Sequence, residues 1–565
     1  MKSLRALALC CLLIASTQAA QAPARKSSST AKKEDECSIA GTVMKLAGSE
    51  PLRKTKITLQ SVNDSALSIS TFADAGGHFE LKRLDPGGYK LRVSRVGFVT
   101  YEYGQRKPGD PGATLTLRPG QQVNDLVFRL IRAGVIAGRI LDEDGEPLPL
   151  VEVSALREVY TEGKRNLSTT AIVETNDLGE YRLFGLPPGR YFVSTLLRPS
   201  NRFGDNGAEP TDPVDLSSQG YARMYYPGTP DAGKANTIIV KTGEEIPSIE
   251  MLMRPVTVYR IRGHVFNQIT HKPGVGTSVI LAPKTTGHGW EFTDQQATVQ
   301  NPDGSFEIAE VLPGPYELIA LWFDERRAYS SSTGVDVGNA DVEGLGIAIG
   351  GGTSVNGRVI WDGRPDLEKD ELTVTPTPKE AHLIFAARTR VNQDNSFTLN
   401  EVGDGTYSVD VSGQSRDCYI KNVAYDGSSV LDRGFTVVRG STASLEITIS
   451  SRGARVQGTV TDHDSLPAPG VWVVLIPDAA HASQHRLYKQ QTTDQYGHFD
   501  LRGTPPGDYK LFSWDKVEEG AWEDPDFLKL FEVKGLGERV TVQDGDTKSI
   551  NIVTIDTASS EVQKP

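Results

Sequence analysis

Apolar and polar positions alternate over many short stretches of this chain. Phe499 and Leu501 flank a polar Asp500, and Val471 and Val473 share one face of a second stretch. A period of two places successive side chains on opposite faces of an extended strand, so one face can be buried. Amphipathic runs of helical length are scarce, whereas 56 Gly and 32 Pro residues interrupt the chain. The pattern therefore predicts many short strands joined by turns.

One passage recurs five times, and its copies span residues 74–91, 176–193, 301–318, 393–409 and 494–511. An aromatic residue starts a strand in each copy: Phe79, Tyr181, Phe306, Phe397 and Phe499. A tyrosine follows ten residues later: Tyr89, Tyr191, Tyr316, Tyr407 and Tyr509. We expect each tyrosine ring to enter the core while its hydroxyl bonds to the backbone, as in the tyrosine corner of immunoglobulin-type sandwiches.

A turn residue stands two positions before each leading aromatic residue: Gly77, Gly179, Gly304, Asn395 and Gly497. Gly adopts positive φ without steric cost and Asn tolerates it, so a tight turn is predicted there. A further glycine lies 38 to 43 residues upstream of each aromatic residue, in an opening strand: Gly41, Gly138, Gly263, Gly357 and Gly458. Each unit then holds about seven short strands in roughly 100 residues, which is typical of a small β-sandwich.

The sequence thus predicts an all-β protein, a tandem array of five antiparallel, seven-stranded Greek-key sandwiches. The expected repeats, numbered 1 to 5, are 37–131, 132–258, 259–351, 352–452 and 453–557. We expect residues 21–36 to be a disordered lead-in, because they are polar and lack aromatic residues, and residues 558–565 to be a frayed tail.

The motifs of these repeats resemble a known family. Residues 142–156 (DEDGEPLPLVEVSAL) and 462–476 (DHDSLPAPGVWVVLI), each followed by the aromatic and tyrosine strands, resemble carboxypeptidase regulatory-like domains. The resemblance implies a prealbumin-like, or transthyretin-like, sandwich with a carbohydrate-binding-like fold, akin to the B-type repeats of collagen adhesins. Such modules are appended to many exported proteins, and long arrays resemble exported proteins of environmental bacteria.

The first twenty residues have the pattern of a secretory signal peptide. Lys2 and Arg5 precede an apolar stretch at residues 6–15, and small residues follow near Ala19 and Ala20. The sequence predicts a secreted protein, in the periplasm, on the outer cell surface or outside the cell. We expect no transmembrane segment in the mature chain. The formal net charge of −12 argues against nucleic acid as a partner.

The chain lacks the pattern of a catalytic domain. A zinc carboxypeptidase needs two His and a Glu as ligands, within a large α/β domain for which no region of this chain remains. The spacing of His288 with Glu291 is close to chance in a chain with nine His residues. His481 and His485 are spaced for one helix face, but a polar excursion between strands explains them better. Asp142 resembles the start of a calcium loop, but a hairpin turn explains it better. We expect no enzyme activity, cofactor or metal, with an unrecognised hydrolase as an alternative.

Aromatic residues after the tyrosine strands are the candidate ligand-binding residues: Trp514, Trp522, Phe527, Trp322, Tyr225 and Tyr226. They occupy comparable positions at one end of each sandwich. Loops that are held by a rigid scaffold often carry ligand-binding residues. Trp faces near acidic side chains suit stacking on sugar rings. The alternative interpretation is that these aromatic residues form seams between neighbouring repeats.

Two cysteines remain after the predicted signal peptide, and they fall in different repeats. Cys37 and Cys418 could form a disulfide between distant modules or remain separate thiols. We interpret the chain as an elongated, exported, non-catalytic protein whose sandwiches act as spacers at the cell envelope. Its candidate partners are a glycan, which would make it a carbohydrate-binding protein, or an envelope protein for which it is an accessory or scaffold subunit.

Overall fold

The protein is all-β in its computed structural model. The structure describes residues 36–64, 67–161, 163–197, 219–284, 295–324, 327–364, 367, 371–379, 388–440 and 442–557. Strands dominate these ranges, and α1 (Pro525–Glu532) is their one α-helix. Four short 3₁₀ helices accompany it: η1 (Ala232–Lys234), η2 (Ala479–His481), η3 (His485–Leu487) and η4 (Ala521–Glu523).

Each of the five units consists of two sheets packed around its own hydrophobic core. In repeat 1 the first sheet contains β4 (His78–Leu84), β1 (Cys37–Lys45) and β8 (Gln122–Leu130). The second contains β3 (Ser68–Phe72), β2 (Lys56–Ser61), β5 (Gly87–Ser94), β6 (Tyr101–Glu102) and β7 (Leu115–Leu117).

Repeats 2 and 3 follow the same order. The first sheet of repeat 2 contains β12 (Glu180–Leu186), β9 (Gly134–Leu141), β17 (Glu245–Ile246) and β18 (Met251–Leu252). Its second sheet contains β11 (Lys164–Glu174), β10 (Val151–Thr161), β13 (Gly189–Leu197), β15 (Met224–Tyr225) and β16 (Ile238–Val240). A small sheet of β14 (Gln219–Tyr221) and β19 (Pro255–Thr257) precedes repeat 3. Repeat 3 contains β21 (Lys272–Pro273), β20 (Tyr259–Asn267), β24 (Ser305–Val311) and β27 (Val342–Ile349), facing β23 (Gln296–Thr298), β22 (Ser278–Pro283), β25 (Gly314–Asp324) and β26 (Arg327–Val337).

Repeats 4 and 5 complete the array. Repeat 4 contains β31 (Ser396–Val402), β28 (Thr353–Asp362), β36 (Ser444–Ser450), β33 (Tyr419–Tyr425) and β34 (Ser428–Ser429), facing β30 (Thr389–Arg390), β29 (Thr373–Pro378), β32 (Gly405–Ser412) and β35 (Phe435–Val437). Repeat 5 contains β40 (His498–Thr504), β37 (Ala454–Thr461), β43 (Thr547–Ser549) and β44 (Ile552–Val553), facing β39 (Lys489–Thr492), β38 (Trp472–Pro477), β41 (Gly507–Trp514) and β42 (Glu538–Val542).

The opening strand of every repeat has the same two neighbours. It pairs antiparallel with the strand that carries the leading aromatic residue. It also pairs in parallel with the closing strand, so this one pairing differs from a purely antiparallel sandwich. The chain can make the parallel pair because the whole second sheet forms the long crossover that such a pairing requires.

The recurring glycine and aromatic residue are partners across these strands. Gly41 lies opposite Phe79 and Gly458 lies opposite Phe499, and the other three repeats have the same register. A Cβ on Gly458 would lie 1.7 Å from the carbonyl oxygen of Ile550 and 3.1 Å from the ring of Phe499. Glycine is needed because the closing strand and the aromatic ring both approach its backbone.

The structure confirms the predicted backbone geometry of the turns and the predicted hydrogen bonds of the tyrosine corners. The five turn residues, Asn395 among them, have φ between +65° and +81°. Four of the tyrosines donate their hydroxyl to the carbonyl four residues earlier, at 2.6–3.0 Å: Tyr89, Tyr191, Tyr407 and Tyr509. Asp142 Oδ1 accepts from the backbone N–H groups of Asp144 and Glu146, so that segment is a hairpin turn, as expected.

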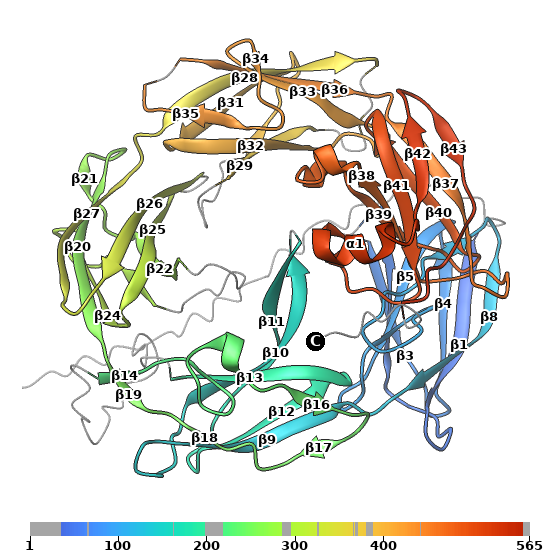
Figure 1. Cartoon of the computed structure of the whole chain (residues 1–565), viewed down its shortest axis with the longest axis horizontal. Helices are drawn as coiled ribbons and strands as arrows, with labels where there is room; N and C mark the ends of the chain where they lie inside the picture. The colour runs from blue at the N-terminus through green and yellow to red at the C-terminus, as the bar shows by residue number, and fades with distance from the viewer. Residues whose placement is uncertain are drawn as a thin grey trace, which may run out of the picture.

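The array closes on itself rather than extending. Figure 1 shows the five sandwiches around a ring, with repeat 5 beside repeat 1, and with the β10–β11 hairpin and α1 on the inner side. The expectation of an elongated spacer is therefore wrong for this structure. The turn of repeat 5 that begins the recurring passage contacts repeat 1, and this contact joins the two ends of the array.

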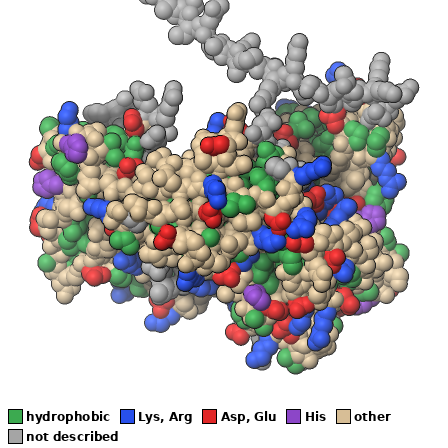
Figure 2. Space-filling model, turned by 90° about the horizontal axis from the view of Figure 1, so that it is seen from above, with side chains coloured by type: hydrophobic (Ala, Val, Ile, Leu, Met, Phe, Trp, Pro, Cys, Tyr) green, Lys and Arg blue, Asp and Glu red, His purple; other side chains and the backbone are tan. Residues whose placement is uncertain are grey.

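Charged side chains of both signs are interspersed on the surface. On the face in Figure 2, Lys and Arg side chains lie among Asp and Glu side chains rather than apart from them. Many form exposed ion pairs, as Arg262 does with Glu307 and Glu343. Such pairs contribute little individually to stability.

Candidate functional site

Trp514 and Trp522 lie inside repeat 5 rather than on its surface. Their exposed fractions are 1% and 0%. Trp514 stacks between Phe512, at 5.1 Å between ring centroids, and Trp522, at 6.4 Å. Helix α1 covers them with Leu528 and Phe531. Neither indole can stack on a sugar, which corrects the prediction that these two residues bind a ligand.

These rings form a second hydrophobic core on the outer face of the sheet of β38 and β41, meaning the face that points away from the main core of the sandwich. We call this group of residues the repeat 5 aromatic cluster. All of its members belong to repeat 5, so it is not a seam between repeats either. Phe527 packs half-buried at its margin, 5.8 Å from the ring of Trp514. The indole N–H groups of Trp514 and Trp522 are buried without a hydrogen-bond partner among the described residues. The cluster holds through apolar packing despite that cost.

The tyrosines of repeat 2 are also mainly structural. Tyr225 is 8% exposed, in β15, which pairs with β13. Tyr226 packs half-buried against the core of repeat 2, and its backbone N–H donates to Val193 at 2.9 Å. The structure therefore does not bring these residues together with Trp322 of repeat 3.

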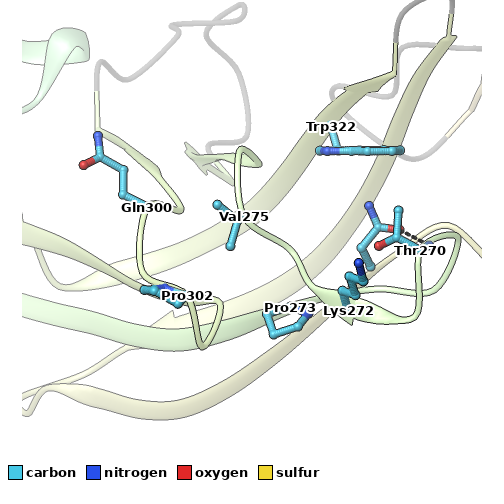
Figure 3. A pocket seen from close by; sticks show the side chains of 8 residues that line it. Thr270, Lys272, Pro273, Val275, Gln300, Pro302 and Trp322 are labelled. Carbon is cyan, nitrogen blue, oxygen red and sulfur yellow. Dashed lines mark hydrogen bonds between the residues drawn. The ribbon is translucent and has the colours of Figure 1, made fainter.

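Trp322 lines an open hollow of about 490 Å³ in repeat 3 (Figure 3). The residues around it are Asn267, Thr270, Lys272, Pro273, Val275, Gln300, Pro302 and Trp322. They come from the end of β20, the turn through β21, the turn before β24, and the end of β25. In Figure 3 the indole ring lies above Lys272 and Thr270, with Val275 between it and Gln300.

The hollow has a rigid floor because its turns are held by hydrogen bonds. Asn267, which is 2% exposed, accepts at Oδ1 from the N–H groups of Ile269 and Thr270, at 2.9 and 3.0 Å. On the far side Gly304 has φ +81° and donates its N–H to Asn301. The indole of Trp322 rests on Tyr329, at 5.3 Å between centroids. The repeat thus positions an aromatic face and several polar groups on ordered strand ends and turns.

Sequence reasoning found Trp322 but missed Asn267, Thr270, Lys272 and Gln300. These residues precede the tyrosine strand, in segments whose sequence indicates only turns. The register supplies the signal that was missed. The turn before the leading aromatic residue returns to the opening strand, so residues 300–302 meet residues 267–275 in space.

His481 and His485 do not converge on one site. His481 Nδ1 lies 2.6 Å from Asp478 Oδ1, and His485 Nδ1 lies 2.8 Å from Glu523 Oε2, so they point to different carboxylates. His288 and Glu291 lie outside the described residues. No group of three or more His, Cys, Asp or Glu side chains is arranged to hold a metal in the part of the chain that the structure describes.

The two cysteines belong to different cores. Cys37 is buried in repeat 1, where its thiol lies 3.0 Å from the carbonyl oxygen of Arg118, and Cys418 is buried in repeat 4. No disulfide joins them, which corrects that alternative. The reason is that each thiol fills its own sandwich. No helix among the described residues is long and apolar enough to cross a membrane.

The curated relatives match only part of this chain. BOS complex subunit NOMO1 from Mus musculus is 29% identical over 174 residues, covering 27% of this chain and 14% of the relative. BOS complex subunit NOMO3 from Homo sapiens is 29% identical over 135 residues, covering 20% and 11%. This chain therefore spans about one seventh or less of the length of these relatives.

Similar solved structures include pilins. The minor pilin GBS52 of Streptococcus agalactiae is 10% identical, with 39% of this chain and 96% of that chain covered and a TM-score of 0.22. The major pilin subunit BcpA of Bacillus cereus is 11% identical, with 56% and 99% covered and a TM-score of 0.13.

The family model of the carboxypeptidase regulatory-like domain matches residues 38–130, which are repeat 1. In repeats 2, 3 and 5 the central strands of the two sheets have the same order as in repeat 1, whereas in repeat 4 the first sheet is extended by β33 and β34. Residues 38–130 therefore match the carboxypeptidase regulatory-like domain family, and four more two-sheet sandwiches follow them.

Proposed function

We propose that this protein is an exported, non-catalytic scaffold that holds its sandwiches in a closed ring and presents binding sites at the cell envelope. The ligand class that we propose is a carbohydrate. The observation that carries the scaffold role is that repeat 5 contacts repeats 1, 2 and 4 through separate sets of residues. A single module that contacts three others fixes their relative positions.

The contact with repeat 1 combines one parallel β-bridge, between Thr114 and Asp494, with side-chain hydrogen bonds. The Gln495 side chain accepts from the backbone N–H of Thr116 at 2.9 Å and donates to its carbonyl at 2.8 Å. Lys90 Nζ donates to Thr492 Oγ1 of repeat 5 at 2.7 Å and to Gly112 at 2.6 Å. Burial lowers the pKa of Lys90, because water is excluded from the junction. A contact this closely fitted favours a fixed junction over a transient one.

The contact with repeat 2 is made by the β10–β11 hairpin. A Cβ on Gly163 at its tip would lie 2.4 Å from the carbonyl oxygen of Glu523, in η4. Likewise, a Cβ on Gly520 would lie 3.1 Å from the carbonyl oxygen of Tyr160. The hairpin tip and the loop before α1 therefore approach each other at backbone distance.

The contact with repeat 4 is mainly polar. The Tyr419 hydroxyl donates to Asp544 Oδ1 at 2.5 Å, and Arg486 pairs with Asp432 at 2.6 Å. A Cβ on Gly503 of repeat 5 would lie 2.6 Å from the carbonyl oxygen of Arg416 in repeat 4. The short connection and these bonds hold repeat 5 at a set angle to repeat 4.

A closed ring has a functional advantage over a flexible array. Sites on different repeats keep fixed spacings, so a polymeric or repeated partner can be bound at several points without reordering the scaffold. A protein partner is the second candidate, because the curated relatives are named as subunits of a complex. The matched family is described as a regulatory-like domain and not as a catalytic one, which supports a non-catalytic role.

Cutting the chain opposite the junction tests the ring. A specific protease site is inserted at residues 350–352, between repeats 3 and 4, and the cut protein is examined by size exclusion and native mass spectrometry. We expect the two halves to stay together, because repeat 5 contacts repeats 1 and 2. The matched double variant Lys90→Ala/Gln495→Ala should weaken that association. Wild-type halves that separate at once would contradict the scaffold.

Export is tested independently. The full chain is produced in a bacterial host, and the product in the periplasm or medium is sequenced from its N-terminus. A product that begins near residues 20–22 supports export, whereas an uncleaved protein confined to the cytosol contradicts it.

A further inference from the structure

Several polar side chains around the repeat 3 hollow have no partner among the residues that the structure describes. Lys272, Gln300 and the indole N–H of Trp322 form no ion pair or side-chain hydrogen bond with other described residues. Elsewhere on this surface, lysines such as Lys421 and Lys510 are paired with carboxylates. Uncommitted groups that line one hollow are available to a ligand without first breaking an internal bond.

The aromatic face is fixed by the sandwich. Trp322 lies near the end of β25, is half-buried, and rests on Tyr329, which is 6% exposed. A ring that is held in place loses little conformational freedom when a ligand stacks on it. The negative face of an indole attracts the slightly positive C–H groups on one side of a sugar ring. The fixed indole of Trp322 therefore favours a flat ligand that presents C–H groups to it.

The charge of the hollow selects among such ligands. Its eight lining residues include one cation, Lys272, and no Asp or Glu. Lys272 Nζ and the Trp322 N–H only donate, whereas Gln300 and Thr270 can donate or accept. Donors therefore predominate around the rim, and an ionised carboxylate is a strong acceptor for an ammonium group. The volume of about 490 Å³ lies within the range of small-molecule sites.

We propose that the repeat 3 hollow binds an acidic sugar, a hexuronate residue of a polysaccharide. The C–H face of the sugar lies on Trp322, its carboxylate meets Lys272 Nζ, and its hydroxyls bond to Gln300 and Thr270. This site rests on the proposed function, because it makes the carbohydrate class specific, and it places the ligand in repeat 3.

The test compares an acidic and a neutral probe of equal length. Binding of tetragalacturonate and of neutral galactotetraose to the full chain is measured by calorimetry at low and at physiological salt. We expect tetragalacturonate to bind more tightly, with an affinity that falls as salt rises, because part of the contact is electrostatic. The exposed Lys272→Gln should lower that affinity by about tenfold or more and leave the thermal melt unchanged.

Matched variants separate binding from folding. Lys56→Gln, an exposed lysine of repeat 1, serves as the charge control and should leave binding unchanged. Trp322→Phe keeps an aromatic ring in place and should weaken binding of both probes, whereas Trp322→Ala should abolish it.

Equal affinity for the two probes, or no effect of Lys272→Gln, would overturn the acidic specificity while leaving carbohydrate binding intact. No binding of either probe would overturn the site altogether. The scaffold proposal is tested separately, by whether the two halves of the cut chain stay together.

Discussion

Trp322 of repeat 3 and Trp514 of repeat 5 lie near the end of the same strand of their sandwiches, but they face opposite ways. Trp514 comes five residues after Tyr509 and joins the cluster on the outer face of the sheet. Trp322 comes six residues after Tyr316 and lies against the inner core at the open end of the sandwich. Because side chains alternate along a strand, one residue of offset moves a ring to the other face.

The two repeats also differ in the segment that comes after this strand. In repeat 5 the chain forms η4 and α1, whose Trp522, Leu528 and Phe531 are buried against the sheet. In repeat 3 the corresponding strand pairs with the antiparallel strand β26, and the indole stays half-exposed beside the hollow. The same residue type therefore serves as core in one repeat and as a candidate binding surface in the other.

The largest expected effect is the loss of an aromatic ring from the repeat 5 cluster. Trp522→Ala should lower the free energy of unfolding by about 3–5 kcal/mol, because it leaves a large cavity in a fully buried cluster. Trp322→Ala should cost only about 1–2 kcal/mol, because that ring is half-exposed. Denaturant unfolding followed by tryptophan fluorescence measures both free-energy changes. Equal changes for the two variants would contradict the view that Trp522 is a core residue and Trp322 a partly exposed one.

The glycines of the opening strands give the next effect. Gly263→Ala should destabilise repeat 3 by about 1–3 kcal/mol, because the new Cβ would lie 2.4 Å from the carbonyl oxygen of Leu345 and 2.8 Å from the ring of Phe306. Gly346→Ala is the matched control, since nothing lies within 4 Å of a Cβ there, and it should stay within about 0.5 kcal/mol. The two melting temperatures decide the point, and similar values would refute the close approach.

A smaller effect concerns the loop of repeat 1 next to repeat 5. Burial raises the pKa of Asp110, so its ionised form is disfavoured in the folded state. The folded protein carries this cost at neutral pH and loses it as the pH falls and the carboxyl is protonated in both states.

Asp110→Asn should therefore melt slightly higher than wild type at pH 7, by less than about 1 kcal/mol in stability, with no difference near pH 3. Thermal melts across this pH range test the prediction. A variant that is less stable at pH 7 than at pH 3, relative to wild type, would show that the ionised carboxylate is needed.

The sandwiches could be predicted from the sequence because their signals are local. The glycine or asparagine turns, the leading aromatic residues and the corner tyrosines each depend on backbone geometry within a few residues. The pairing of Gly41 with Phe79 could not be predicted from their separation along the chain, because register is a property of two strands.

The ring and the hollow were beyond sequence reasoning for a similar reason. Gln495 contacts Thr116, 379 residues earlier, and no periodic pattern encodes that distance. Trp514 was predicted to lie in a loop, although its odd spacing from the buried Tyr509 already places it on the outer face of the strand. Lys272 and Gln300 become neighbours only when the opening strand and the turn before β24 come together in space.

Small-angle X-ray scattering of the intact protein tests the central claim most directly. A closed ring predicts a radius of gyration not far above the roughly 24 Å expected for a compact chain of this length, and a pair-distance distribution that ends abruptly. The Lys90→Ala/Gln495→Ala variant should have a larger radius as repeat 5 leaves repeat 1. An extended rod-like distribution for the wild-type protein, unchanged in the variant, would contradict the closed ring.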